Sequence, residues 1–123
     1  KKGAIASSVA HDSHNIVVIG CSDEEMARAA NMIIKSKGGL VAWSYDQHKC
    51  IPLPIAGLMT DQNGYKIAGD YLLLVALAKE FGSTLNDPFM TMGFMSLLVI
   101  PKLKLSDKGL FDCEKFQLTE LFE

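Results

Sequence analysis

Apolar residues open the chain in two short runs, which predict two β-strands over residues 3–10 and 15–21. The second run, NIVVIGC, is rich in β-branched residues and does not alternate with polar ones. Strands with that pattern are typically buried on both faces, so we expect this strand at the centre of a sheet. The polar stretch HDSH between the two runs then forms a tight connection.

A helix is predicted directly after the second strand. Ser22 and Glu25 have the spacing of a capping box, in which each side chain satisfies a backbone donor at the start of a helix. Gly38 and Gly39 are typical of a helix end. Between these two signals the apolar residues recur at helical spacing, at Met26, Ala29, Ala30 and Ile33.

The middle of the chain predicts two more strands and a second helix. GLVAWSY is typical of a strand, and DQHK, which contains His48, of the turn after it. In the next extended segment, CIPLPIAGL, two prolines restrict the strand to an edge or a covered rim of the sheet. Asp61 can cap a helix that ends near Phe81. Its central stretch YLLLVALA is apolar on every side, so we expect neighbours to cover both faces.

The last third of the chain begins with residues 88–101, which contain no charged residue. This run is shorter than the ~20 apolar residues that span a bilayer, so it predicts a buried core segment and no membrane span. The tail turns at residues 107–109 before another strand-like stretch. Together these elements predict an α/β chain of the α+β kind: a mixed β-sheet with two main helices packed on it, forming a single auxiliary domain over residues 1–123.

Composition narrows the possible partners. The chain has 123 residues, 49% of them hydrophobic, and a formal net charge of −2, which argues against nucleic-acid binding. Cys21, Cys50 and Cys113 are far apart and odd in number, so we expect no disulfide framework and a reducing, cytoplasmic location. A small domain this apolar exposes a hydrophobic patch when it is alone. We therefore expect a partner surface, either a second copy in a homodimer or another domain.

His11 and His14 are the best candidates for chemistry. Two imidazoles three residues apart, with Asp12 between them, can bind a transition metal or transfer protons near neutral pH. A metal would need further ligands, and the sequence supplies none at a recognisable spacing. The alternative is a polar turn in which Asp12, Ser13 and Asn15 satisfy backbone donors. The residues alone leave both interpretations open.

Four long strings carry a family resemblance: GAIASSVAHDSHNIVVIGCSDEEMARAAN, IPLPIAGLMTD, DPFMTMGFMSLLVIPKLKLSDKGLFD and EKFQLTELF. They resemble the C-terminal domain of the bacterial-type adenine deaminases, members of the amidohydrolase superfamily. The similarity extends from about Gly3 to Phe122. It is specific because several long ungapped strings match, where a short motif would be weak.

The resemblance implies a function for the full-length protein. It implies a metal-dependent hydrolase in which bound Mn or Fe activates water, adenine is the substrate, and hypoxanthine and ammonia are the products of a purine-salvage reaction. In that superfamily the metal ligands lie in a (β/α)-barrel that precedes this segment. We therefore expect no metal or other cofactor in this chain, an inactive isolated fragment, and the barrel domain of the same protein as its partner.

The resemblance also selects a site. The family string around VAHDSHN matches residues 8–15, so His11, Asp12, Ser13 and His14 are the candidates for a site shared with the barrel. An alternative hypothesis is a stand-alone module for ligand binding or assembly that only shares descent with this domain. Both hypotheses predict the same fold.

Overall fold

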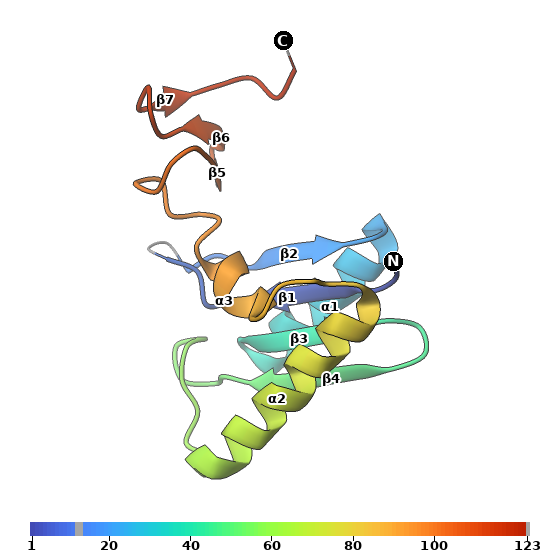
Figure 1. Cartoon of the computed structure of the whole chain (residues 1–123). Helices are drawn as coiled ribbons and strands as arrows, with labels where there is room; N and C mark the ends of the chain where they lie inside the picture. The colour runs from blue at the N-terminus through green and yellow to red at the C-terminus, as the bar shows by residue number, and fades with distance from the viewer. Residues whose placement is uncertain (12–13, 123) are drawn as a thin grey trace.

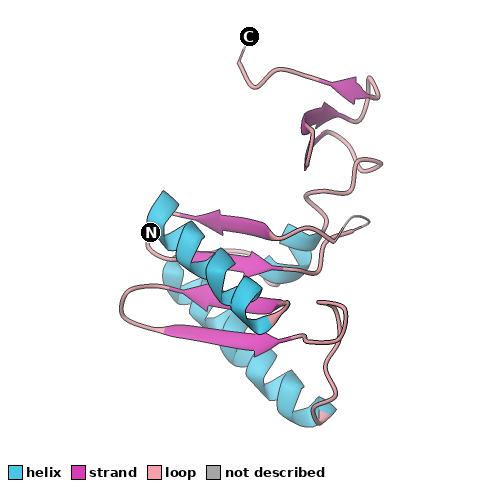
Figure 2. Ribbon diagram, turned by 180° about the vertical axis from the view of Figure 1, so that it is seen from behind, coloured by secondary structure: helices cyan, strands magenta, loops and turns pink. Residues whose placement is uncertain are grey.

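The structure, a computed structural model of the chain, describes residues 1–11 and 14–122. Its larger part is a four-stranded sheet with the strand order β2-β1-β3-β4. These strands are β1 (Ala4–Ser7), β2 (Val17–Gly20), β3 (Gly39–Trp43) and β4 (His48–Pro52). Helix α1 (Asp23–Ser36) covers one face, and α2 (Gly64–Phe81) with the short α3 (Pro88–Gly93) covers the other, as Figure 1 shows. Figure 2 shows the same layers from behind.

Each face of this sheet has its own apolar core, because successive side chains of a strand point to opposite faces. Val41 of β3 packs with Ala29 and Ile33 of α1. The next residue of the strand, Ala42, belongs to the core on the other face, together with Leu74 of α2. The predicted α+β class with two main helices packed on a sheet is therefore confirmed.

A second, smaller sheet follows α3. It consists of β5 (Leu103–Ser106), β6 (Gly109–Asp112) and β7 (Gln117–Leu118) in that order. The turn expected at residues 107–109 joins β5 to β6. This sheet projects away from the larger one in Figure 1, and its residues 105–107 border a hollow together with Val17 and Val18 of β2.

Strand directions differ from the expectation of a mixed sheet, because every pair of named strands is antiparallel. The reason is the position of β1. It pairs with β2 through a hairpin and with β3 after the α1 crossover, so β2 and β3 run in the same direction on either side of it. The unit is a βαβ crossover with an antiparallel strand inserted between its two parallel strands.

The position predicted for β2 was wrong. The strand lies at one edge of the sheet, and Ile19 is 51% exposed. A continuous apolar run is thus not sufficient evidence for a central strand, since the order of strands depends on long-range pairing. The other edge is β4, as its prolines predicted, although His48 begins this strand and does not lie in the turn before it.

Helix α1 follows its local sequence signals. The Ser22 hydroxyl accepts a hydrogen bond from the Glu25 backbone N–H at 3.3 Å, as a capping residue does. The buried Glu25 carboxylate accepts from the Ser22 hydroxyl at 3.0 Å and from the Gly3 N–H at 2.7 Å. It therefore connects the start of α1 to the segment before β1. Lys37, in the left-handed conformation, ends the helix.

Helix α2 corrects one prediction and leaves another open. Its cap is Asn63 and not Asp61, because the Asn63 side chain accepts from the backbone N–H groups of Tyr65 and Lys66. Leu72 is 70% and Leu73 57% exposed in this chain, so a neighbour that covers this face of the helix stays a prediction about a partner. The predicted end at Phe81 is correct.

Residues 88–101 were expected in the core, and only their first part lies there. In α3, Phe89 and Met92 are buried, whereas Val99 in the following turns is largely exposed. Asp87 caps α3 and Pro88 occupies its first turn, a combination that favours a helix start. Across residues 1–11 and 14–122, none of the helices has both the length and the apolar character that crossing a membrane demands.

Candidate functional site

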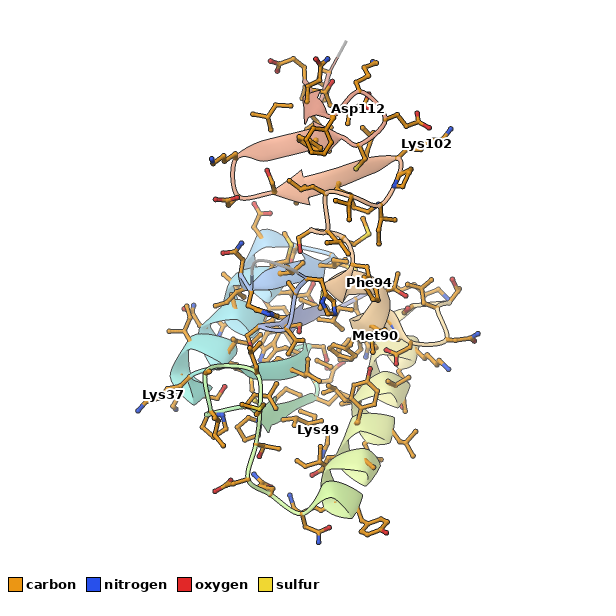
Figure 3. The ribbon with its side chains drawn as sticks, turned by 90° about the vertical axis from the view of Figure 1, so that its left-hand side faces the viewer. Lys37, Lys49, Met90, Phe94, Lys102 and Asp112 are labelled. Atoms are coloured by element: carbon orange, nitrogen blue, oxygen red, sulfur yellow. The ribbon has the colours of Figure 1, made fainter. Side chains whose placement is uncertain are left out.

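The loop that contains the predicted site residues leaves β1 at one end of the larger sheet. Residues 53–62, which follow β4, and the end of α3 lie at the same end of the sheet (Figure 3). Phe94 and Met90 are labelled in that figure on the α3 side of the sheet, below the projecting strands, and Lys37 is labelled on the α1 side. Segments distant in sequence thus meet around His11 and His14.

His11 is held in place on both its backbone and its ring. Its N–H donates to the Gly93 carbonyl at 2.9 Å, and its carbonyl accepts from the Ser96 hydroxyl at 3.1 Å. The imidazole stacks on Phe94 with 4.9 Å between ring centroids and 13° between ring planes. The side chain is partly buried. These contacts join the loop to the segment that follows α3.

His14 is exposed, and its ring centroid lies 6.4 Å from that of His11. The Ala10 N–H donates to His14 Nδ1 at 3.4 Å. A neutral His14 with this contact carries its proton on Nε2, because Nδ1 must have a lone pair to accept. The contact is of the kind that a polar turn predicts.

Asp12 and Ser13, the other two predicted site residues, lie outside the described residues. Among residues 1–11 and 14–122, no three His, Cys, Asp or Glu side chains cluster closely enough to hold a metal ion. The described donors therefore do not make a ligand set for Mn or Fe. A shared-site role for His11, Asp12, Ser13 and His14 stays a prediction.

The two histidines line different cavities. His11 lines one of about 210 Å³ on the α2 and α3 side of the sheet. His14 lines another of about 260 Å³ on the α1 side, together with Lys37 and Gly57. His11 and His14 thus border two separate hollows at the same end of the molecule.

Tyr71 and Asp87, which sequence reasoning did not select, line the cavity beside His11. The Tyr71 hydroxyl donates to Asp87 Oδ1 at 2.6 Å, which links α2 to the cap of α3. Burial, and then the hydrogen bond and charge of Asp87, raise the pKa of Tyr71 well above its usual value. The Asp-Pro pair could have identified the start of α3, but no sequence signal pairs residues 71 and 87.

The remaining candidates do not gather at this end. His48 lies in β4 and is exposed. Cys21, Cys50 and Cys113 are all within the described residues and have free thiols, as the sequence predicted. Neither His48 nor the cysteines form part of a site with His11.

The fold and this end define a small α+β domain in which residues 1–11 and 14–122 hold no cluster of metal ligands. A comparison with protein families gives a match to the model of the adenine deaminase C-terminal domain over residues 1–117. The chain therefore belongs to this family, as the resemblance indicated.

Curated relatives agree with this assignment. The chain is 51% identical over 122 residues to an adenine deaminase of Methanosarcina acetivorans, which covers 99% of this chain and 22% of the relative. It is 54% identical over 121 residues to an adenine deaminase of Sulfurovum sp., with 98% of this chain and 23% of the relative covered. An adenine deaminase of Borreliella burgdorferi is 49% identical over 117 residues. The chain thus spans less than a quarter of the length of these relatives.

Proposed function

We propose that this chain is the C-terminal domain of an adenine deaminase, which hydrolyses adenine to hypoxanthine and ammonia in purine salvage. The observation that carries the proposal is about 50% identity to proteins of that name over nearly the whole chain, combined with coverage of only 22% of their length. The catalytic residues would then lie in the remaining part of the protein, its amidohydrolase barrel.

The metal of this reaction, Mn or Fe, would be held by the barrel, because the described residues of this chain lack a cluster of ligands. When bound, the metal supplies an activated water for attack on the amino-bearing carbon of the purine. This chain would contribute by positioning side chains next to the barrel. His11 is fixed by Gly93 and Phe94, so its imidazole can present a defined surface to the barrel.

The barrel is also the partner we propose for the apolar surface. Leu72 and Leu73 of α2 are exposed, and large exposed apolar patches mark interaction sites. Separated from the barrel, the chain should dimerise or bind a hydrophobic dye, and the full-length protein should do so less. A monomer with no excess dye binding would contradict this part of the proposal.

The assignment of compartment follows from the thiols. Free cysteines are typical of reducing conditions, and we propose a cytoplasmic protein.

The decisive experiment uses the full-length protein with His11→Ala and His14→Ala. If the loop orients substrate or transfers a proton, turnover of adenine falls by ~10-fold or more and metal content is unchanged. His48→Ala is the matched control, because His48 is exposed on β4 and away from this end. If these variants have a lower melting temperature but kinetic constants within about twofold of the parent, the loop is only a structural turn and its role in the active site is excluded.

A second measurement separates the parts of the protein. The 123-residue chain alone should neither deaminate adenine nor retain a stoichiometric metal after dialysis. Tight one-to-one Mn, Fe or Zn in this chain would contradict the assignment of the metal to the barrel.

A further inference from the structure

An apolar groove lies on the face of the larger sheet that α2 and α3 cover only in part. Ile5 of β1 and Ile19 of β2 are direct partners in the sheet, and both line one side of the groove. The connection after α2, α3 itself and the turn after it line the other side, with Leu85, Met92 and Met95 among their residues. The groove has a volume of about 330 Å³.

The floor of this groove is buried, and its rim is exposed and apolar. Met92 lies in the floor and is buried, whereas Ile19, Leu85 and Met95 are exposed apolar side chains of the rim. Among the described residues that line the groove, Lys1 alone carries a charge. Exposed apolar surface of this kind marks an interaction site, so the groove favours an occupant with apolar side chains.

Lys1 lies at one end of the groove, beside the end of α2 (Figure 1). Its backbone nitrogen donates to the Phe81 carbonyl at 2.9 Å, and the Lys2 N–H donates to the same carbonyl at 3.2 Å. A Cβ at Gly82 would lie 3.0 Å from the Lys1 nitrogen, so the glycine permits this close approach. A residue joined to the Lys1 nitrogen therefore starts at the rim of the groove.

The relatives of this chain have a long polypeptide before the matched region. The chain spans only 22% of one adenine deaminase and 23% of another, and the matching family is a C-terminal domain. More than three-quarters of such a protein therefore precedes this domain and is connected to it at the position of Lys1. Extended polypeptide rises about 3.3 Å per residue, so four residues of that connection are as long as β2.

We propose that the residues directly before Lys1 in the full-length protein are extended along this groove and place apolar side chains over Ile19 and Met95. The occupant is thus the connection to the rest of the protein, and it covers the part of the sheet that α2 and α3 leave exposed. The inference rests on membership in the family and on the position of Lys1. It does not depend on the reaction that we propose.

The test compares two full-length proteins. In one, about ten residues before Lys1 are native, and in the other they are replaced by a flexible Gly-Ser sequence of equal length, which has no apolar side chains. Oxidation by hydrogen peroxide, followed by peptide mass spectrometry, measures the reactivity of each methionine. We expect Met95 to react at least about fivefold more slowly in the native protein, because the connection must open before the sulfur is reached. Met59, exposed in the loop after β4, is the internal control and should react equally in both proteins.

A point variant tests the groove without a change in the connection. Ile19→Glu in the full-length protein should raise the oxidation rate of Met95 to that of the Gly-Ser protein, because a charge is costly in an apolar contact. Ile34→Glu is the matched control. Ile34 is also an exposed isoleucine, but it lies on α1 at the other face of the sheet, so Met95 should remain protected in this variant.

Three results would overturn the proposal. If Met95 reacts equally fast in the native and the Gly-Ser proteins, the groove is open. If Met95 stays protected in the Gly-Ser protein, another part of the protein or a second copy covers the groove. If Ile19→Glu leaves Met95 as protected as Ile34→Glu does, the contact does not involve β2.

The outcomes for this inference and for the proposed function are separable. Methionine oxidation requires no adenine, and deamination of adenine by the full-length protein does not report on the groove. An active enzyme with a reactive Met95 overturns only this inference. Protection of Met95 that the Gly-Ser replacement removes supports it even if the full-length protein does not act on adenine.

Discussion

The body of the molecule, residues 1–93, and its C-terminal arm, residues 103–122, are both built on antiparallel strands, but they differ in what the strands bury. In the body, two helical layers enclose the sheet and form an apolar core on each face. In the arm, Leu103 and Leu105 of β5 are 48% and 61% exposed, and the residue between them, Lys104, is only 8% exposed. The arm therefore places a charged side chain inside and apolar side chains outside.

Hydrogen bonds to backbone carbonyls satisfy the ammonium group of the buried Lys104. Its ammonium donates to the carbonyls of Leu103 at 3.2 Å and Pro101 at 3.5 Å. These neutral partners belong to the arm and the segment just before it. Strand pairing gives this sheet its shape. A small sheet without a packed apolar face is only marginally stable in water. The apolar side of the arm is thus free to pack against the barrel that we propose as partner.

The largest difference in unfolding free energy between the two regions should come from replacing one leucine by alanine in each. Leu74→Ala removes a fully buried side chain from the core beneath α2 and should lower the free energy of unfolding by about 2–5 kcal/mol. Leu105→Ala in the arm should change it by less than about 0.5 kcal/mol. Urea unfolding followed by circular dichroism measures both. Equal costs would mean that the arm belongs to the same cooperative unit.

The link between α2 and α3 gives an intermediate effect within the body. Tyr71→Phe removes the hydroxyl that donates to Asp87 and should cost about 1.5–3 kcal/mol, the range for a hydrogen bond to a charged group. The raised pKa of Tyr71 sets the pH dependence. Its stabilisation is complete below the usual tyrosine pKa, about 10, and is lost as pH rises above it, because the unfolded chain ionises first. The variant should therefore be less sensitive than the parent to alkaline unfolding between about pH 10 and 12.

Removal of the arm should have a smaller effect on the body. A chain that ends at residue 101 should unfold with a free energy within about 1 kcal/mol of the parent, because the arm is not part of either core cluster. Backbone amide resonances of the buried core residues should keep their positions. Dye binding should fall with the exposed leucines of the arm. A shortened chain that does not fold would show that the body needs the arm.

The smallest effect concerns two carboxylates, one in each region. Hydrogen bonds from Lys49, and then from Lys66, lower the pKa of Asp70 in α2. A lowered pKa contributes stability above the usual value, about pH 4, and this contribution disappears as pH falls through the lowered value. Asp70→Asn should flatten the decline of the body's melting temperature between pH 6 and 3.

Asp112 in the arm is the matched control. Its pKa is lowered chiefly by the backbone N–H of Lys115, also in the arm. Asp112→Asn should leave the acid dependence of the body unchanged. If the melting temperatures of Asp70→Asn and of the parent fall equally with pH, the hydrogen bond from Lys49 does not contribute to the stability of the body.

The sequence predicted elements whose signals are local. Helix α1 begins and ends near Ser22 and Lys37 because capping and left-handed residues act within one turn of the helix. The edge position of β2 could not be predicted, because it depends on β1 pairing with β3 across the whole of α1. The choice of Asn63 over Asp61 as a cap depends on which residue lies next to the helix, and both types are equally good caps.

The same distinction holds for the candidate site. The closeness of His11 and His14 follows from their spacing in one short loop. Phe94 under His11, and Asp87 beside Tyr71, result from the packing of α3 on the sheet and on α2. Such contacts depend on tertiary packing, so a single sequence contains no pattern that pairs them.

The unequal edges of the larger sheet limit how copies of this domain can aggregate. The β4 edge carries Pro52, which has no N–H to donate, and Lys49, and both residue types discourage an added strand. The β2 edge consists of Val17, Val18, Ile19 and Gly20, and contains neither residue type. Two copies that met through β2 would be related by a two-fold axis and would use up both unprotected edges. Association through this sheet would therefore stop at a closed pair and could not propagate into a filament.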